Sequence, residues 1–488
     1  MKKKLLSVLL STAMVSALLV GCNGTTTEEV VDDGTTEVVD DGATEVVDDG
    51  AAAADEGAVL NIYCWNEEFK SRVEDHYPGY EKVDATTGKI GDVTVKFNIT
   101  PNQDNAYQNN LDEKLLAQDS AAADDKIDIF LVEADYALKY VDTDYALALS
   151  EIGITDADVA DQYEYTKEIV TDSNGNLKGS SWQGCPAGLI YRRDLAEEVL
   201  GTSDPAEVQE YVKDWDTFLD TAAKMKDKGY QMVSSTNDIY RPFSNNVTSG
   251  WVENNQVQID ANIDKWIDLS KTMADEKYAG THDLWSDTWS AGFYYDGQAR
   301  DDNGEVKMTE DGKVAGTTKP VFCYFGPAWM INFSMGQDNE GSIAHDGGWG
   351  FVEGPMSYYW GGTWMCVASG TDNPTLCKDL VLTMTTDKDV LREITTEDLD
   401  FTNSMSLMTE LGADSSVQNP VLGGQNPYTD MAASAEGIDM SNIGPYDQGC
   451  NEEMQKAMRN YFEGNATKEE ALELFNKGVF EKYPVLAQ

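Results

Sequence analysis

The stretch VLNIY at residues 59–63 opens the part of the chain that decides the fold, and the apolar run IDIFLV at residues 127–132 closes it. Between them, residues 93–99 (VTVKFNI) alternate apolar and polar side chains, as in a strand with one buried face. Leucines within residues 111–116 recur at helical spacing. Strands and helices that alternate within about 75 residues predict βαβ units, and therefore an α/β fold on a mostly parallel sheet.

The end of the chain is predicted to be helical. Apolar residues within 454–462 share one helix face, and Gly464 follows as a stop signal. Thr467 and Glu470 have the spacing of a capping box that begins another helix. The segment 251–362 is rich in Gly, Asp, Asn and aromatic residues. We expect both strands and helices there, but residue propensities do not define their order.

The chain is strongly acidic. It has 87 Asp and Glu against 35 Lys and Arg in 488 residues, a formal net charge of −52 at pH 7. Proteins bind phosphate backbones through clustered Lys and Arg, so nucleic acid is not an expected partner and anionic ligands are disfavoured. Neutral and cationic ligands remain. The hydrophobic fraction of 41% supports a large core, and the length predicts about two to three domains.

Residues 1–21 are predicted to be a signal peptide. Three lysines precede the apolar residues 5–20, a run shorter than the ~20 residues that span a bilayer. The sequence LVGC at residues 19–22 resembles the bacterial lipobox, after which the signal is removed and Cys22 receives a diacylglycerol. Two acyl chains on Cys22 would hold the protein stably at the membrane surface. An ordinary signal peptide that happens to precede a cysteine is the alternative.

Residues 22–57 are predicted to be a disordered acidic tether. They contain the imperfect repeat TTEVVDDG and ATEVVDDG at residues 35–50, and no Lys or Arg. Repulsion between like charges and a low apolar content oppose ordered packing. Calcium binding by the repeated aspartates is an alternative, but calcium loops need ligands and glycines at fixed offsets in a folded turn.

Metal sites and common catalytic motifs are not evident in the sequence. Six cysteines follow Cys22, without a C-x-x-C pair, and three histidines lie far apart, so we expect no zinc site and no cofactor. The six cysteines fit either up to three disulfides or buried thiols. No P-loop, G-x-S-x-G or H-E-x-x-H motif occurs. A pair of carboxylates that hydrolyses glycosides remains open, because 87 acidic residues always place some pair at that distance.

Two segments of the chain have a distinctive pattern, residues 189–195 (LIYRRDL) and residues 213–219 (KDWDTFL) with 222–229 (AAKMKDKG). They resemble extracellular solute-binding proteins of ABC importers, in particular the maltose-binding branch. The later segment is similar to a helix of that family, and the earlier one is similar to the strand and helix start before it. Residues 325–329 (FGPAW) resemble the family's N-G-P-W segment, with Phe in place of Asn and an added Ala. Residues 361–368 (GGTWMCVA) resemble a return strand, and Asn373-Pro374 begins the helix expected after it. The resemblance runs from about residue 58 to the end.

The resemblance implies a two-lobed, periplasmic-binding-protein-like α/β fold of type II, with a ligand cleft between the lobes. Residues 58–184 with 364–416 would form the first lobe, and residues 185–363 with 417–488 the second. Hinge closure around the ligand would be the mechanism, because contacts from both lobes exist only in the closed state. A protein of this kind breaks no bond, so we expect no enzyme activity.

A sugar is the ligand that we predict. Pyranose rings present flat C–H faces and a rim of hydroxyls, which suit aromatic platforms together with carboxylate, amide and Arg groups. Trp329 is the first candidate, from its motif, and Asp135 matches the family's cleft aspartate, with Tyr136 where that branch often has Arg. Arg241 with Tyr240 lies where the family places an aromatic residue of the second lobe. The other candidates, each of which also fits the core, the rim or, for the acid, a helix N-terminus, are Trp65, Glu67, Trp182, Trp360, Trp364 and Tyr446.

We therefore expect a monomeric, lipid-anchored receptor on the outer face of the bacterial cytoplasmic membrane, which delivers an oligosaccharide to an ABC transporter permease. Two alternatives come from other classes of function. A receptor for polyamines or other cations would share the fold, and the negative charge would attract its ligand. A surface glycoside hydrolase would instead release products from an oligosaccharide.

Overall fold

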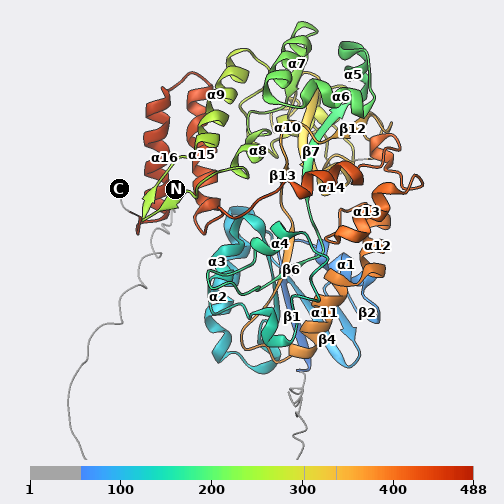
Figure 1. The fold of residues 1–488 in the computed structure, drawn as a ribbon, viewed down its shortest axis with the longest axis vertical. Helices are drawn as coiled ribbons and strands as arrows, with labels where there is room; N and C mark the ends of the chain where they lie inside the picture. The colour runs from blue at the N-terminus through green and yellow to red at the C-terminus, as the bar shows by residue number, and fades with distance from the viewer. Residues whose placement is uncertain (1–56, 302, 337, 487–488) are drawn as a thin grey trace, which may run out of the picture. The chain divides into compact units, whose positions relative to one another are not determined.

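The computed structural model describes residues 57–301, 303–336 and 338–486, and the predicted signal peptide, Cys22 and almost all of the tether lie outside these residues. The described chain contains two β-sheets surrounded by helices (Figure 1). This confirms the predicted α/β class. Among the described residues, no helix is long and apolar enough to cross a membrane.

The first sheet has seven strands in the order β2-β3-β4-β1-β5-β14-β6. Their bounds are β1 (Val59–Cys64), β2 (Tyr80–Lys82), β3 (Thr87–Ile90), β4 (Val93–Ile99), β5 (Ile129–Glu133), β6 (Ser180–Ser181) and β14 (Thr363–Val367). All six residues of β1 are buried, because β1 lies at the centre of the sheet with β4 on one side and β5 on the other.

The prediction of a mostly parallel sheet is wrong. Only two neighbouring pairs in this sheet are parallel, β1 with β4 and β1 with β5. The short connections between β2, β3 and β4 make hairpins, which are antiparallel. At the other side, β14 returns from the second sheet and pairs antiparallel with β5 and β6.

The second sheet has the strand order β12-β7-β11-β8, and β13 also pairs with β7. Its strands are β7 (Pro186–Arg192), β8 (Gln231–Val233), β11 (Val321–Pro327), β12 (Trp349–Val352) and β13 (Tyr358–Tyr359). The strands β9 (Val252–Glu253) and β10 (Gln256–Val257) form a separate hairpin. The chain therefore leaves the first sheet after β6, builds the second sheet, and returns to the first through β14.

Helices surround both sheets. In chain order they are α1 (Glu68–His76), α2 (Ala106–Ala117), α3 (Ala137–Val141), α4 (Glu164–Glu168), α5 (Arg193–Leu200), α6 (Pro205–Val212), α7 (Trp215–Asp227), α8 (Tyr240–Ser244), α9 (Ala261–Asp275), α10 (Asp287–Ser290), α11 (Pro374–Thr386), α12 (Lys388–Glu397), α13 (Met405–Ala413), α14 (Tyr428–Glu436), α15 (Asp447–Phe462) and α16 (Lys468–Lys482). In Figure 1, α1 to α4 and α11 lie around the first sheet, and α5 to α8 with α10 lie around the second.

Local signals in the sequence position several of these helices. The predicted capping box is confirmed: Thr467 accepts a hydrogen bond from the backbone of Glu470, whose carboxylate accepts one from Thr467 N. Pro374 occupies the first turn of α11, where its missing N–H costs no intrahelical bond. Asp214 caps α7 through its hydrogen bond to Thr217 N.

The six cysteines after residue 57 are buried thiols. Of the two alternatives that the sequence left open, the structure therefore has buried thiols. Within the described ranges, no group of three or more His, Cys, Asp or Glu side chains could hold a metal ion.

Candidate functional site

A cleft of about 590 Å³ is lined in part by aromatic residues, and its volume is within the ~300–1,000 Å³ typical of small-molecule sites. Segments attached to both sheets contribute to it. On the first sheet these are the loop and helix after β1, and on the second the turn after β11. The residues that line the cleft are Trp65, Asn66, Glu67, Glu68, Ser71, Arg72, Glu133, Gln183, Trp285, Trp329, Asn332, Phe333, Ser334, Trp360, Gly361, Gly362, Thr363, Asp398 and Asp400.

Three tryptophans form one wall of the cleft. Trp285 stacks on Trp329 with ring centroids 6.1 Å apart and an interplanar angle of 22°. Trp360 packs edge-on against Trp329 at 5.3 Å and lies 5.7 Å from Trp285. The indole N–H of Trp329 donates a hydrogen bond to the carbonyl of Trp360 at 3.0 Å, which fixes the ring over the crossover between the sheets. We call Trp285, Trp329 and Trp360 the aromatic wall.

The crossover beside the aromatic wall requires glycine. Gly361 and Gly362 have φ of 74° and 98°, a region that glycine adopts without steric cost. A Cβ at position 361 would lie 3.2 Å from the indole nitrogen of Trp329. The two glycines therefore let the backbone approach the indole closely.

Two aromatic side chains at the cleft are unusually exposed. Trp285 is 56% exposed and has a φ of 66°, which is uncommon for a residue with a bulky side chain. Phe333 is 82% exposed and lies in a five-residue π-helical turn, Met330–Ser334. Backbone outliers and π-helical turns occur often at functional sites, so both features favour a binding role for this wall.

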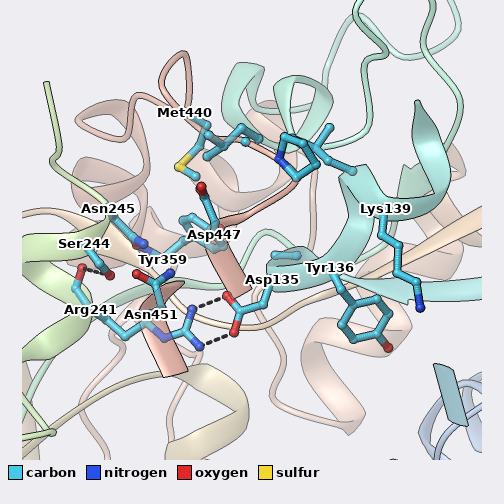
Figure 2. A pocket seen from close by; sticks show the side chains of 15 residues that line it. Asp135, Tyr136, Lys139, Arg241, Ser244, Asn245, Tyr359, Met440, Asp447 and Asn451 are labelled. Atoms are coloured by element: carbon cyan, nitrogen blue, oxygen red, sulfur yellow. Dashed lines mark hydrogen bonds and ion pairs between the residues drawn. The ribbon is translucent and has the colours of Figure 1, made fainter. Parts of the chain in front are cut away.

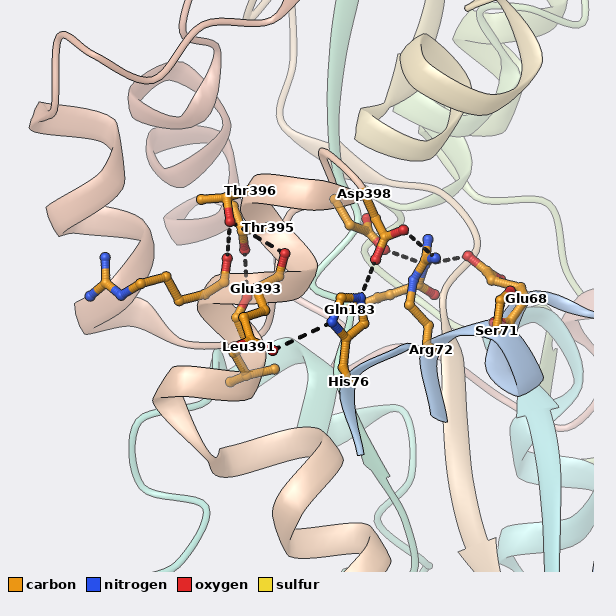
Figure 3. A network of polar contacts seen from close by, with 12 residues as sticks. Glu68, Ser71, Arg72, His76, Gln183, Leu391, Glu393, Thr395, Thr396 and Asp398 are labelled. Atoms are coloured by element: carbon orange, nitrogen blue, oxygen red, sulfur yellow. Dashed lines mark hydrogen bonds and ion pairs between the residues drawn. The ribbon is translucent and has the colours of Figure 1, made fainter. Parts of the chain in front are cut away.

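Another part of the cleft lining is polar and centred on α1 (Figure 3). Gln183 Nε2 donates to Glu68 at 2.9 Å and to Asp400 at 2.8 Å. Arg72 forms an ion pair with Asp398 at 2.8 Å, and His76 Nε2 lies 2.8 Å from the same carboxylate. This network of Glu68, Arg72, Gln183, Asp398 and Asp400 is the polar wall. It holds acceptors and donors in fixed positions beside the aromatic wall.

Burial alters the protonation of the carboxylates. Burial, assisted by the charge of Asp400, raises the pKa of Glu68 to about 7. Burial also raises the pKa of Asp400. The pKa of Glu133 is raised by burial and then by nearby Asp135. Near neutral pH the cleft can therefore present a carboxyl group as a hydrogen-bond donor as well as an acceptor.

A second cavity, of about 30 Å³, lies beside the ion pair between Asp135 and Arg241 (Figure 2). Arg241 Nη1 donates to Asp135 Oδ1 at 2.5 Å, and Nη2 donates to Oδ2. Asp447 also lines this cavity, and burial raises its pKa to about 7. We call it the small cavity.

The structure separates the predicted site residues into three groups. Trp65, Glu67, Trp329 and Trp360 line the cleft. Asp135, Tyr136 and Arg241 line the small cavity. The remaining four, which line neither cavity, are Trp182, Tyr240, Trp364 and Tyr446.

That remaining group packs inside the protein or against neighbouring side chains. Trp182 and Trp364 have no exposed surface, and Tyr240 is 2% exposed. Trp364 donates to the carbonyl of Thr166 at 2.8 Å and Tyr240 to Asn451 at 2.6 Å, so their polar atoms are bound within the protein. We leave these three residues, and the partly buried Tyr446, out of the proposed ligand contacts.

Several cleft residues were not among those predicted from the sequence, namely Trp285, Phe333, Glu68, Arg72, Gln183, Asp398 and Asp400. Trp285 lies in the sequence DLWSDTWS at residues 283–290, where no periodicity separates it from Trp289. Yet Trp289 is 1% exposed and belongs to the core. The polar wall joins α1 to residues more than 100 positions later, so no local spacing could have predicted it.

Segments attached to two different sheets thus line one cleft. The family model described as "Bacterial extracellular solute-binding protein" matches residues 83–417, and the chain belongs to that family. Family membership makes the chain a solute receptor and not an enzyme, which sets the hydrolase alternative aside.

Solved structures share the fold. A structure described as extracellular solute-binding protein family 1 is 17% identical, covers 86% of this chain and 100% of its own, and has a TM-score of 0.64. The sugar-binding protein MalE from Xanthomonas citri is 15% identical, with 87% and 98% covered and a TM-score of 0.61. The lacto-N-biose complex of a binding protein from Bifidobacterium longum is 12% identical, with 89% and 100% covered and a TM-score of 0.60. The comparison with curated proteins gives no match.

Proposed function

We propose that this chain captures an extracellular sugar, specifically an oligosaccharide, and delivers it to an ABC transporter permease. The observation that carries the proposal is that the aromatic wall and the polar wall line the same cleft. A sugar ring stacks its C–H face on an indole and directs its hydroxyls to donors and acceptors at its edge. Trp285 and Trp329 supply stacked indoles, and Glu68 and Gln183 supply hydrogen-bonding groups.

Hinge closure would couple binding to a change of shape. We propose residues 58–184 with 364–416 as one moving lobe, and residues 185–363 with 417–488 as the other. The crossovers between the sheets include Gln183 and residues 360–362, which line the cleft. A ligand that contacts Trp329 and Glu68 at once would stabilise the closed state over the open one, because those contacts exist together only in the closed state.

Delivery to a permease and attachment through Cys22 complete the proposal. Family membership supports an extracellular location. Similar structures were solved with β-1,6-galactobiose bound to an ABC transporter associated protein of B. animalis subsp. lactis, and with maltose bound to MalE3 of T. maritima. These relatives favour an oligosaccharide. The lipobox resemblance at residues 19–22 supports the anchor.

A thermal-shift screen tests the proposal. A ligand that binds only the folded state stabilises it and so raises the melting temperature. At a ligand concentration one hundred times the dissociation constant, the stabilisation is ~2.7 kcal/mol. The screen contains neutral mono- and oligosaccharides, uronic acids, amino acids and polyamines. We expect stabilisation by a neutral oligosaccharide. Stabilisation by polyamines alone would refute a sugar receptor.

A cation receptor is the second candidate, favoured by the charge of the cleft. Its lining contains the acids Glu67, Glu68, Glu133, Asp398 and Asp400 and one arginine, Arg72. Attraction between such a cleft and a cation is screened by salt. Affinity that falls steeply between low and high salt would favour a cation, whereas a neutral sugar should bind with little dependence on salt.

A further inference from the structure

The ion pair between Asp135 and Arg241 lines the small cavity and contacts two residues of the cleft lining, Trp360 and Glu133. Asp135 is in a short turn, Ala134–Tyr136, directly after β5 of the first sheet. Arg241 is in α8, which packs beside β13 at the second sheet. The pair therefore connects segments attached to different sheets.

Both partners touch residues that line the cleft. The Arg241 guanidinium lies 5.6 Å from the ring centroid of Trp360, which belongs to the aromatic wall. The carboxylate of Glu133, another cleft residue, accepts a hydrogen bond from Asp135 N at 2.9 Å. The other side of the same ion pair lines the small cavity. Two charged side chains and the residues that they contact thus separate the two spaces.

The small cavity has a polar lining but little room. A volume of about 30 Å³ suits a water molecule and not a sugar ring. Asp447 lines it, and in the described part of the chain the Oδ1 atom of Asp447 is buried without a hydrogen-bond partner. Figure 2 shows Asp447 and Asn451 close to the ion pair. The space behind the ion pair could therefore receive hydroxyl groups if the pair were absent.

We propose that the Asp135–Arg241 ion pair, together with the cleft residues Trp360 and Glu133 that it contacts, forms the end wall of the ligand cleft and limits the length of the sugar that the cleft accepts. The inference rests on the proposed sugar receptor. A short oligosaccharide fits between the aromatic wall and the polar wall. A longer one has to extend past Trp360 into the position of the ion pair.

The ion pair resists such displacement. It is bidentate, and the side chains of Arg241 and Asp135 are only 19% and 24% exposed. Charge-assisted bidentate pairs are strong and geometrically specific. A ligand that separates the partners leaves two charges partly desolvated, and an uncompensated buried charge is costly. Ligand groups that cannot replace both partners are therefore excluded.

Removal of both charges tests the end wall. The variant Asp135→Ala/Arg241→Ala removes the wall without leaving one partner unpaired, and Arg241→Lys keeps the positive charge opposite Asp135. The matched control is Arg392→Ala/Glu410→Ala, which removes an exposed ion pair outside both cavities. Isothermal titration with the two- to five-ring members of the maltose, cellobiose and β-1,6-galactobiose series gives affinity as a function of length.

In the wild type and in the control we expect affinity to fall beyond the longest sugar that fits. In the double-alanine variant the ratio of long-chain to short-chain affinity should rise about tenfold or more, and Arg241→Lys should keep the wild-type preference. An unchanged ratio, or an equal loss for all lengths, would overturn the end wall. An equal loss of affinity for all sugar lengths would instead mean that the ion pair only holds together the two segments that contain Asp135 and Arg241.

A crystal structure of the ligand-free double-alanine variant gives a readout that needs no sugar. We expect one continuous cavity from Trp329 to Asp447. Two separate cavities would refute the end wall even if the titrations detected no binding. If no sugar of any length binds the wild type, the sugar receptor is refuted, and the cavity in the variant still decides the role of the ion pair.

Discussion

Replacement of Trp285 by alanine separates ligand binding from stability. Trp285 lines the cleft, is 56% exposed, and contacts Trp289, Trp329 and Trp360 with ring centroids 4.9, 6.1 and 5.7 Å away. Truncation of a core Trp costs ~3–5 kcal/mol, and about half of this indole is already in solvent, so we expect a loss of about 2 kcal/mol in unfolding free energy. Alanine is as strained as tryptophan at the φ of 66°, so no backbone term is added.

Trp285→Ala should also weaken sugar binding strongly. A stacking indole at the centre of a ligand site contributes ~2 kcal/mol or more, which is about thirtyfold in dissociation constant. Isothermal titration with the sugar found in the thermal-shift screen measures the affinity, and urea unfolding of the ligand-free protein measures the stability.

Two further variants serve as controls for Trp285→Ala. Trp289→Ala removes a neighbouring indole that is 1% exposed, so it should cost ~3–5 kcal/mol of stability. Tyr295→Ala removes a 38% exposed ring that does not line the cleft, and it should leave affinity unchanged. Affinity within threefold of wild type in Trp285→Ala, under conditions where the variant is folded, would show that the aromatic wall is not the sugar platform.

Three more predictions concern other parts of the chain. The pKa of Glu68 is raised from 4.5 to about 7, so the folded state binds the Glu68 proton more tightly than the unfolded state does. The free energy of unfolding therefore falls as pH rises from about 4.5 through 7. In urea unfolding, Glu68→Gln should remove ~1–3 kcal/mol of that fall between pH 5 and 8. Equal pH dependence in both proteins would contradict this. Deletion of residues 23–57 should leave sugar affinity unchanged, because the cleft residues all follow residue 57; a tenfold weaker affinity by titration would refute it. Cys22→Ala should release the protein from the membrane fraction or leave it unprocessed, and retention of the processed variant would disprove the anchor.

Elements with strong local signals were predictable from the sequence. The apolar runs at residues 59–63 and 127–132 became β1 and β5, and the capping box of Thr467 and Glu470 begins α16. The direction of the outer strands was not predictable in this way. A period-two pattern defines the two faces of a strand but not its neighbour, so the antiparallel pairing of β14 with β5 needed the tertiary structure.

The site was only partly predictable, for a similar reason. The motif at residues 325–329 identified Trp329, and the position after β1 identified Trp65 and Glu67. Composition alone could not distinguish the exposed Trp285 from the buried Trp182, because both lie among polar residues in the sequence. The class of fold, the acidity and the family were thus determined by the sequence itself. Tertiary structure decided which aromatic rings face the cleft and that Arg241 pairs with Asp135, 106 positions away, because burial and ion pairing depend on segments that meet only after folding.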